Sequence, residues 1–204
     1  MSKPKLESHK RIIESAKEEF LEYGFENASL RRIASNAGIT VSGLYKHFAN
    51  KEEMFASLIQ PMLDDFYELY YQKEQEEHNA IIKLGSSAAF LNDDAVFTME
   101  YIYDHQDEFK LLVCCSQGTR YENYAQKFAE LEEKSSLKYI DALKKRGDYV
   151  PEFDMKEFHL LVSANVEAVL QPIRHNFSRE EAMHYAQTIN TFFSKGWKWL
   201  CGME

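Results

Sequence analysis

Twelve residues near the N-terminal end of the chain concentrate side chains that suit contact with a polyanion. The hydroxyl groups of Thr40, Ser42 and Tyr45 can hydrogen-bond to phosphate oxygens, and Lys46 and Lys51 carry positive charge. The residues between them include small ones, so the backbone can approach a nucleic acid closely. The segment therefore indicates contact with nucleic acid rather than catalysis.

Other chemically capable side chains are scattered along the sequence. It contains no H-E-x-x-H, C-x-x-C or G-x-S-x-G pattern and no glycine-rich phosphate loop. We therefore predict no catalytic residue, no metal ligand, no cofactor and no enzymatic activity. The dispersed candidates for a metal or hydrolase site are His78, Asp104, His105, His159, His175, His184 and the three cysteines. A redox- or metal-sensing regulator built on the adjacent Cys114 and Cys115 remains an alternative.

Charge is distributed unevenly between the two parts of the chain. Residues 1–51 hold nine basic and six acidic side chains, for a net charge of +3, whereas the rest carries −12. This asymmetry predicts that only the N-terminal region approaches a polyanion. The chain has 45% hydrophobic residues but only 8 Gly and 4 Pro, which disfavours an all-β fold.

Two short helices joined by a glycine turn are expected to position the polar side chains. Apolar residues at helical spacing predict a first helix that includes Phe20 and ends at Gly24. Ser29 is the expected N-cap of a second helix closed by Gly38, and Thr40 is the expected N-cap of a third. The third is too short to be stable alone, so its neighbours must hold it. This arrangement is a helix-turn-helix.

Residues 8–53 resemble the DNA-binding domain of TetR-type transcriptional regulators. The similarity rests on the runs SLRRIA at 29–34, AGITVSG at 37–43 and LYKHFANKE at 44–52. It covers about a quarter of the chain, and its Leu-Tyr-x-His-Phe-x-x-Lys pattern is specific. The resemblance implies a homodimer that binds a palindromic operator, usually as a repressor, and responds to a small molecule.

Chemistry predicts two kinds of DNA contact in this region, phosphate contacts that set register and base contacts that read sequence. The expected phosphate contacts are Ser29, Thr40, Tyr45, His47 and Lys51. The expected base-reading surface is Arg31, Val41, Ser42, Gly43 and Lys46, in which Gly43 only permits close approach. Half-buried packing is the alternative for His47, and solvation is the alternative for Lys46. Arg32 is expected to be an exposed surface charge.

The remainder also reads as helices, which makes the predicted fold class all-α. The predicted helices span 50–72, 92–105, 105–115, 120–146, 155–173 and 179–200. Pro61 is expected to kink or break the first of these. The expected N-caps of the helices at 92–105, 155–173 and 179–200 are Asn92 or Asp93, Asp154 and Ser178. We expect a three-helix DNA-binding domain over 1–52 and a larger regulatory and dimerisation domain over 53–204.

The last two predicted helices are apolar over more than half of their circumference. In the helix at 155–173, Phe158 and Val162 belong to one stripe, while Leu160 and Ala164 lie on a flanking face. A helix with two apolar faces must bury both of them. A central core helix would satisfy this need, but the resemblance implies that both helices pair with their copies in a four-helix dimer interface.

Aromatic side chains with hydroxyl groups are frequent in the middle of the chain, and they suit an apolar or aromatic small molecule. Tyr101 and His105 lie four residues apart and are expected to share a helical face, and Asn165 interrupts an apolar stripe. The candidate effector-binding residues are Phe97, Tyr101, His105, Tyr121, Tyr124, Phe128 and Asn165. Ordinary core packing is the alternative for each of them.

The sequence has no apolar run of membrane-spanning length, and its N-terminus lacks the apolar core of a signal peptide. We therefore expect a cytoplasmic protein without membrane contact. The favoured interpretation is a homodimeric repressor that a small molecule releases from a palindromic operator. A helical interaction protein that does not touch DNA is a further alternative.

Overall fold

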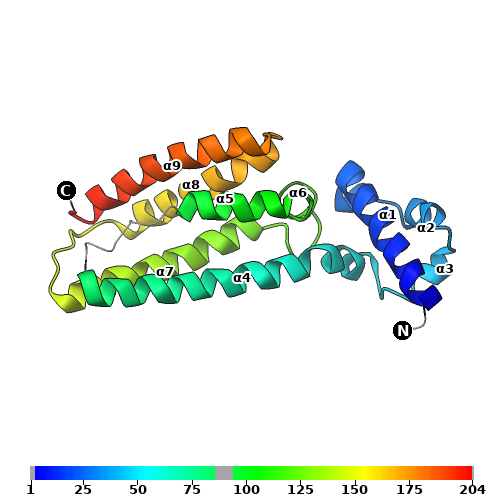
Figure 1. Ribbon diagram of the computed structural model, residues 1–204, viewed down its shortest axis with the longest axis horizontal. Coiled ribbons are helices and arrows are strands. Elements are labelled where there is room, and N and C mark those ends of the chain that lie inside the picture. The colour runs from blue at the N-terminus through cyan, green and yellow to red at the C-terminus, as the bar shows by residue number, and fades with distance from the viewer. Residues whose placement is uncertain (1–2, 86–93, 204) are drawn as a thin grey trace. The chain divides into compact units, whose positions relative to one another are not determined.

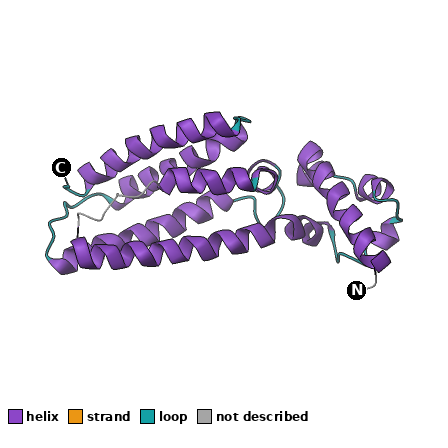
Figure 2. Ribbon diagram, viewed as in Figure 1, coloured by secondary structure: helices purple, strands orange, loops and turns teal. Residues whose placement is uncertain are grey.

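The computed structural model describes residues 3–85 and 94–203, and the regular secondary structure within these ranges is helical (Figure 2). The all-α prediction is thus confirmed. No helix in this described part is long and apolar enough to cross a membrane. The helices, labelled as in Figure 1, are α1 (Lys3–Asn27), α2 (Leu30–Asn36), α3 (Val41–Leu44), α4 (Lys51–Leu84), α5 (Asp94–Asp104), α6 (Gln106–Cys114), α7 (Tyr124–Arg146), α8 (Met155–Arg174) and α9 (Arg179–Leu200).

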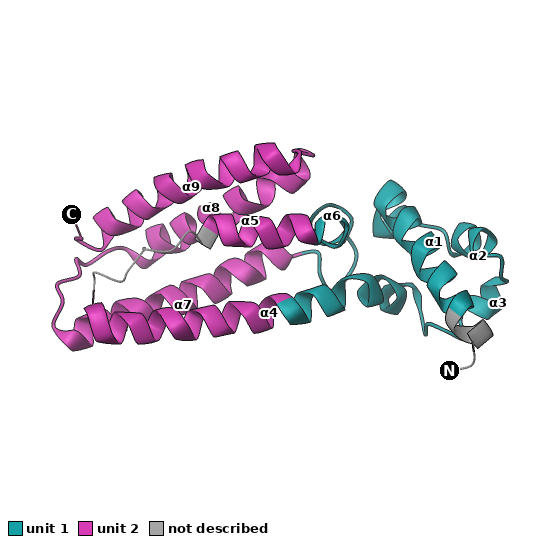
Figure 3. Cartoon of the chain, viewed as in Figure 1, with its two compact units in different colours: residues 1–65, 105–122 teal, residues 66–104, 123–204 magenta. Residues whose placement is uncertain are grey.

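The chain divides into two compact units (Figure 3). The first comprises Met1–Asp65 and His105–Glu122, and the second comprises Phe66–Asp104 and Asn123–Glu204. The first unit therefore includes α6 in addition to α1, α2, α3 and the beginning of α4. This division by packing differs from the boundary expected at residue 52, because α6 packs against α1. The assignment of separate functions to 1–52 and 53–204 stays a prediction.

Helix α1 supplies much of the core of the first unit. Ile12, Ala16 and Phe20 are fully buried at intervals of four residues, and the Phe20 ring meets that of Phe55 edge-on at 5.1 Å. Gly24 interrupts the helix with φ +70° and ψ 168°, a backbone conformation that residues other than glycine rarely adopt. The helical turn resumes beyond it and runs to Asn27, so the predicted end at Gly24 is a kink rather than a terminus.

Helices α2 and α3 have the predicted caps. The Ser29 hydroxyl oxygen accepts from the Arg32 backbone N–H at 3.4 Å, and the Thr40 hydroxyl oxygen accepts from Gly43 at 3.1 Å. Gly38, with φ +68°, forms the turn between the two helices. The four-residue α3 is anchored by Leu44, whose side chain is 1% exposed. Packing against neighbouring helices therefore holds this short helix, as expected.

Helix α4 is continuous from Lys51 to Leu84 with Pro61 inside it. The predicted end near residue 72 is wrong, and Pro61 does not break the helix. Pro61 is exposed, whereas Met62 and Leu63 directly after it are buried. We infer that packing of this buried face outweighs the proline penalty, which is about 3 kcal/mol in a helix interior.

Other boundaries lie close to the predicted ones. Helix α7 begins four residues after the predicted position at 120, because residues 115–123 form a loop with hydrogen bonds of its own. The Thr119 hydroxyl donates to the Ser116 carbonyl at 2.6 Å, and the Gly118 N–H donates to Glu122 at 3.1 Å. Asn92 and Asp93, the predicted caps of α5, lie outside the described residues.

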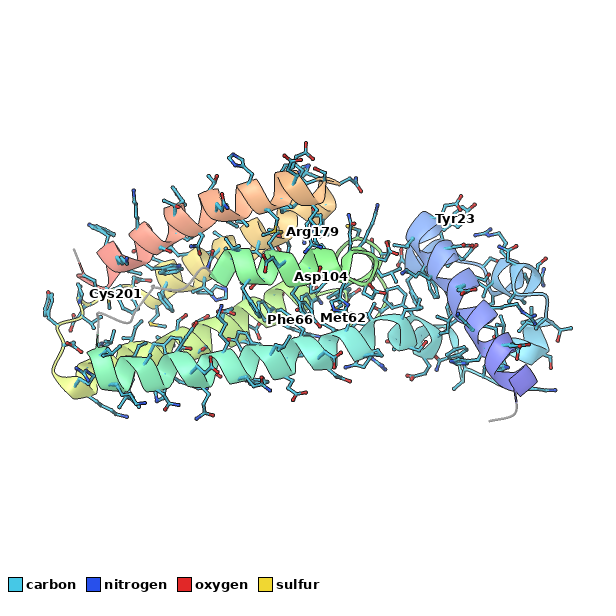
Figure 4. All side chains as sticks on the ribbon, in the orientation of Figure 1. Tyr23, Met62, Phe66, Asp104, Arg179 and Cys201 are labelled. Carbon is cyan, nitrogen blue, oxygen red and sulfur yellow. The ribbon has the colours of Figure 1, made fainter. Side chains whose placement is uncertain are left out.

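The helices of the second unit lie side by side, with α7 along α8 and α5 along α9 (Figure 1). An ion pair of 2.7 Å between Asp104 and Arg179 joins α5 to the beginning of α9 (Figure 4). The predicted caps of the last two helices are confirmed. Asp154 accepts from two backbone N–H groups of α8, and Ser178 forms a capping box with Glu181 at α9.

Candidate nucleic-acid interface

The structure leaves the predicted DNA-contacting residues of α2 and α3 accessible to different degrees. The exposed members are Arg31, Thr40, Ser42, Tyr45 and Lys46, and the half-buried members are Ser29, Val41, Gly43, His47 and Lys51. The Tyr45 side chain is the most prominent apolar one, with 54% of its surface exposed. A ring that projects from the end of a short helix in this way can place its hydroxyl against a phosphate.

The two capping hydroxyls retain a donor for a ligand. The Ser29 and Thr40 oxygens each accept a backbone N–H of their own helix. A hydroxyl group has one hydrogen to donate in addition to its acceptor sites. Each cap can therefore hold its helix and donate to a phosphate oxygen at the same time.

His47 lies beside a second histidine of α1. Its ring centroid is 5.6 Å from that of His9, which in turn stacks on Phe48 at 5.3 Å. His47 is half-buried, as the packing alternative expected. Its contact with phosphate stays a prediction.

Lys51 is the first residue of α4 and is partly engaged within the protein. Its ammonium group donates to the Glu26 carbonyl at 3.1 Å and lies 4.7 Å from the centre of the Phe25 ring. Burial lowers the pKa of Lys51, while Glu19 and Glu26 act in the opposite direction. Because an ammonium group has three donors, the others remain available to a phosphate.

Two consecutive arginines of α2 have different environments. Both are exposed, but Arg32 also forms an ion pair with Glu19 of α1 at 2.5 Å. The Arg32 guanidinium also lies 4.2 Å from the ring centre of Tyr23, which Figure 4 labels on α1. Arg32 is exposed, as expected. The sequence did not predict that a buried carboxylate on a neighbouring helix also holds it.

Three of the predicted effector-binding residues meet in the second unit. Tyr124 and Phe128 of α7 stack at 5.9 Å with an interplanar angle of 11°. Phe66 of α4, labelled in Figure 4, joins the group, and its ring lies 5.3 Å from that of Tyr101 and 5.5 Å from that of Phe128. We call Phe66, Tyr101, Tyr124 and Phe128 the aromatic cluster. Burial and neighbouring tyrosines raise the pKa of Tyr124 well above its usual value, so its hydroxyl stays a neutral donor.

The contribution of α4 to this cluster was not predicted from the sequence. Phe66 and Tyr70 lie four residues apart, and the Tyr70 ring also meets Phe128 at 5.5 Å. Their i, i+4 spacing within a predicted helix was the available signal. It indicated a shared face, but not which helix would pack against that face.

The remaining effector candidates do not join the aromatic cluster. Phe97 is 41% exposed and packs beneath the Lys73 ammonium group at 4.6 Å. Tyr121 belongs to the first unit, where its hydroxyl donates to Gln60 at 2.6 Å. Asn165 is half-buried in α8. His105 also belongs to the first unit.

The predicted helical face shared by Tyr101 and His105 is wrong. Helix α5 ends at Asp104, and His105 is the N-cap of α6 with φ −120° and ψ 40°. These dihedral angles lie outside the helical region. The break between the two helices therefore separates residues that a continuous helix would have aligned.

The cysteines and histidines offer little support for a sensor or metal site. None of the three cysteines forms a disulfide, and burial raises the pKa of Cys115 to about 11. A thiol of that pKa is protonated at neutral pH and therefore a poor nucleophile or ligand. Within the ranges that the structure describes, no three His, Cys, Asp or Glu side chains are grouped to hold a metal ion.

Residues 12–58 match the family model described as bacterial regulatory proteins, tetR family. The match covers about a quarter of the chain and confirms the predicted similarity of its N-terminal region to TetR-type regulators. The chain is 28% identical to the HTH-type transcriptional regulator SAR2658 of Staphylococcus aureus (strain MRSA252) over 190 residues, which cover 93% of the chain and 95% of that relative. It is 37% identical to the regulator SAB2452 of Staphylococcus aureus (strain bovine RF122 / ET3-1) over 79 residues, 39% and 43% of the two chains.

A solved structure shares the fold of this chain. It is that of NalD, the secondary repressor of the MexAB-OprM multidrug efflux pump in Pseudomonas aeruginosa, with 17% identity and a TM-score of 0.50. The alignment covers 92% of this chain and 96% of NalD. The family match falls on α1, α2, α3 and the first turns of α4, where the exposed polar residues lie.

Proposed function

We propose that the protein is a TetR-type regulator, a homodimeric repressor that binds a palindromic operator through α2 and α3. The observation that carries the proposal is the accessible set of hydroxyl and cationic side chains on α3 and the turn after it, including Ser42, Tyr45 and Lys46. Two such surfaces related by a two-fold axis read two copies of one half-site. This activity would place the protein in the cytoplasm, where it meets chromosomal DNA.

The proposed contacts divide by chemistry. Ser29, Thr40, Tyr45, His47 and Lys51 bind phosphates and set the position of α3 in the major groove. Arg31 reads a guanine through its two-pronged guanidinium group, and Val41 packs against a thymine methyl group. Ser42, Gly43 and Lys46 complete the base-reading surface.

Exposed apolar side chains on α8 and α9 support the dimer. Leu160 is 66% exposed, Phe192 is 71% exposed and Trp199 is 67% exposed. The opposite face of α8 is buried, with Phe158 2% and Val162 3% exposed. A helix with one buried and one exposed apolar face fits the two-faced pattern of the sequence, and a second copy is the occupant that we propose for the exposed face.

The aromatic cluster supports an apolar or aromatic effector. Its rings come from three helices, α4, α5 and α7, and two of its four members carry hydroxyl groups that give orientation to a bound molecule. Such an effector releases DNA only if it binds the DNA-incompetent conformer more tightly. By reciprocity, operator DNA weakens effector binding by the same factor.

The first experiment is selection of binding sites from a random duplex library, followed by a salt titration on the enriched sequence. We expect an inverted repeat and a steep dependence of affinity on salt. Lys46→Gln should weaken binding, whereas Lys145→Gln, which removes the same charge from an exposed ion pair of α7, should leave it unchanged. A folded protein that enriches no sequence at low salt would remove the DNA-binding proposal.

A further inference from the structure

A carboxylate is buried inside the proposed DNA-binding region. Glu19 is 4% exposed on α1, next to the fully buried Phe20. Its Oε1 atom accepts from the Ser29 backbone N–H at 2.7 Å and from Arg32 Nε at 2.8 Å. Burial alone would raise the pKa of Glu19, but these donors hold it below its ordinary value. The side chain is therefore a charged acceptor at the beginning of α2.

The Arg32 guanidinium group makes most of its contacts with α1 and the turn after it. Its Nε also lies 3.0 Å from the second Glu19 oxygen, and its Nη2 donates to the Asn27 carbonyl at 3.3 Å. One face of the guanidinium covers the Tyr23 ring at 4.2 Å. Arg31, one position earlier on the same helix, is exposed.

We infer that Glu19 and Arg32 are positioning residues for DNA binding, and that Arg32 does not touch DNA itself. Glu19 fixes the Ser29 backbone directly, and Arg32 fixes the first turn of α2 to α1. Together they orient the Ser29 hydroxyl towards a phosphate and Arg31 towards the major groove. This inference rests on the proposed binding of DNA by α2 and α3.

The burial of Glu19 explains why Arg32 stays in place when DNA arrives. If the guanidinium turned to a phosphate, the carboxylate would remain buried with the Ser29 N–H as its main donor. A buried charge without its partner is strongly destabilising. Arg31 has no such constraint and is the member of the pair that can reach DNA.

The test measures the affinity of full-length variants for the selected operator, a panel of its single-base variants, and a range of salt concentrations. We expect Arg32→Gln to weaken binding roughly tenfold for every sequence, since a strong charge-assisted contact is lost, and to leave the salt slope unchanged. Arg31→Gln is the matched control, and its loss should depend on one base pair. A salt slope that falls by about 0.9 in Arg32→Gln would indicate a direct phosphate contact and overturn the inference.

Arg32→Lys separates positioning from simple charge, and it is less disruptive to folding. It keeps the positive charge but cannot form the two-pronged contact with Glu19. We expect it to lose affinity as Arg32→Gln does, with thermal unfolding confirming that the variant is folded. Wild-type affinity in Arg32→Lys, or unchanged affinity in folded Arg32→Gln, would overturn the positioning role.

Glu19→Gln tests whether the two residues act together. It keeps an oxygen acceptor for Ser29 but removes the charge that holds Arg32. We expect the double variant Glu19→Gln/Arg32→Gln to bind DNA no more weakly than either single variant, because both break one connection. Additive losses would contradict this. If the wild-type chain bound no duplex, the proposed function itself would fail. If the wild type bound DNA but Arg32→Gln lost affinity at one base pair only, as expected for Arg31→Gln, only the positioning role would be refuted.

Discussion

Tyr45 illustrates how a single exposed group can set affinity without setting specificity. Its side chain is 54% exposed directly after α3, where its hydroxyl is expected to donate to a phosphate. Tyr45→Phe keeps the ring and removes the donor, which should weaken binding by about 1.5 kcal/mol per protomer, as for other hydrogen bonds to charged groups. Affinity for a panel of operator variants should fall by the same factor throughout. A loss confined to one base pair would instead make Tyr45 a base reader.

Val41 should show the opposite behaviour. It begins α3 and is half-buried, so part of its side chain can meet a thymine methyl group. Val41→Ala should lower the preference at one base pair by about 1 kcal/mol, the low end for a specific base contact, and leave the other positions unchanged. The same operator panel measures this. Equal losses across the panel would count against a base-reading role.

At the residue scale, the sequence predicted local contacts well and distant ones poorly. Ser29 and Thr40 were predictable caps because their partners lie three residues away along the chain. The ion pair of Arg32 with Glu19 was not predictable, because Glu19 lies thirteen residues earlier on another helix. The part that Phe66 plays in the aromatic cluster was not predictable for the same reason, because Phe66 and Phe128 meet only through the packing of α4 against α7.

At the scale of elements, α3 depends on its cap more than a longer helix would. It has four residues, and the Thr40 hydroxyl satisfies the Gly43 N–H. Thr40→Ala should reduce the free energy of unfolding by about 1 kcal/mol, the usual value of an N-cap, as measured by urea denaturation. Thr40→Ser is the control and should retain nearly all of it. Equal stability of Thr40→Ala and the wild type would show that neighbouring packing alone fixes α3.

The lengths of the long helices were harder to predict than their existence. The charged residues after position 72 gave no reason to continue α4, yet Ile81 near its end is 4% exposed and packs in a core with Leu143 and Phe158. Partners on α7 and α8 thus stabilise the last turns of α4. Periodicity along one segment contains no information about partners that lie sixty or more residues away.

For the whole molecule, the charge distribution restricts which surface can meet DNA. The chain carries a net charge of −9, but residues 1–51 carry +3. DNA phosphates attract this N-terminal region and repel the rest. Screening by salt weakens both effects, so added salt lowers the attraction of the N-terminal region and also relieves the repulsion of the rest.

The exposed apolar faces of α8 and α9 lead to a prediction about assembly. Phe192→Asp places a charge on a side chain that is 71% exposed in the single chain, so its effect on the stability of one subunit should stay within about 0.5 kcal/mol. In a dimer interface the same charge would be buried without a partner, which is strongly destabilising. Sedimentation equilibrium should therefore show a monomer.

The loss of the dimer in Phe192→Asp should also weaken operator binding. A monomer engages one half-site at a time and loses the advantage of two linked sites, so affinity for the inverted repeat should fall to about that for a single half-site. Ile82→Asp, on the 50% exposed Ile82 of α4, is the control that should remain dimeric. A Phe192→Asp variant that stays dimeric and keeps full operator affinity would mean that the pairing surface lies elsewhere. The apolar faces of α8 and α9 would then require a different partner.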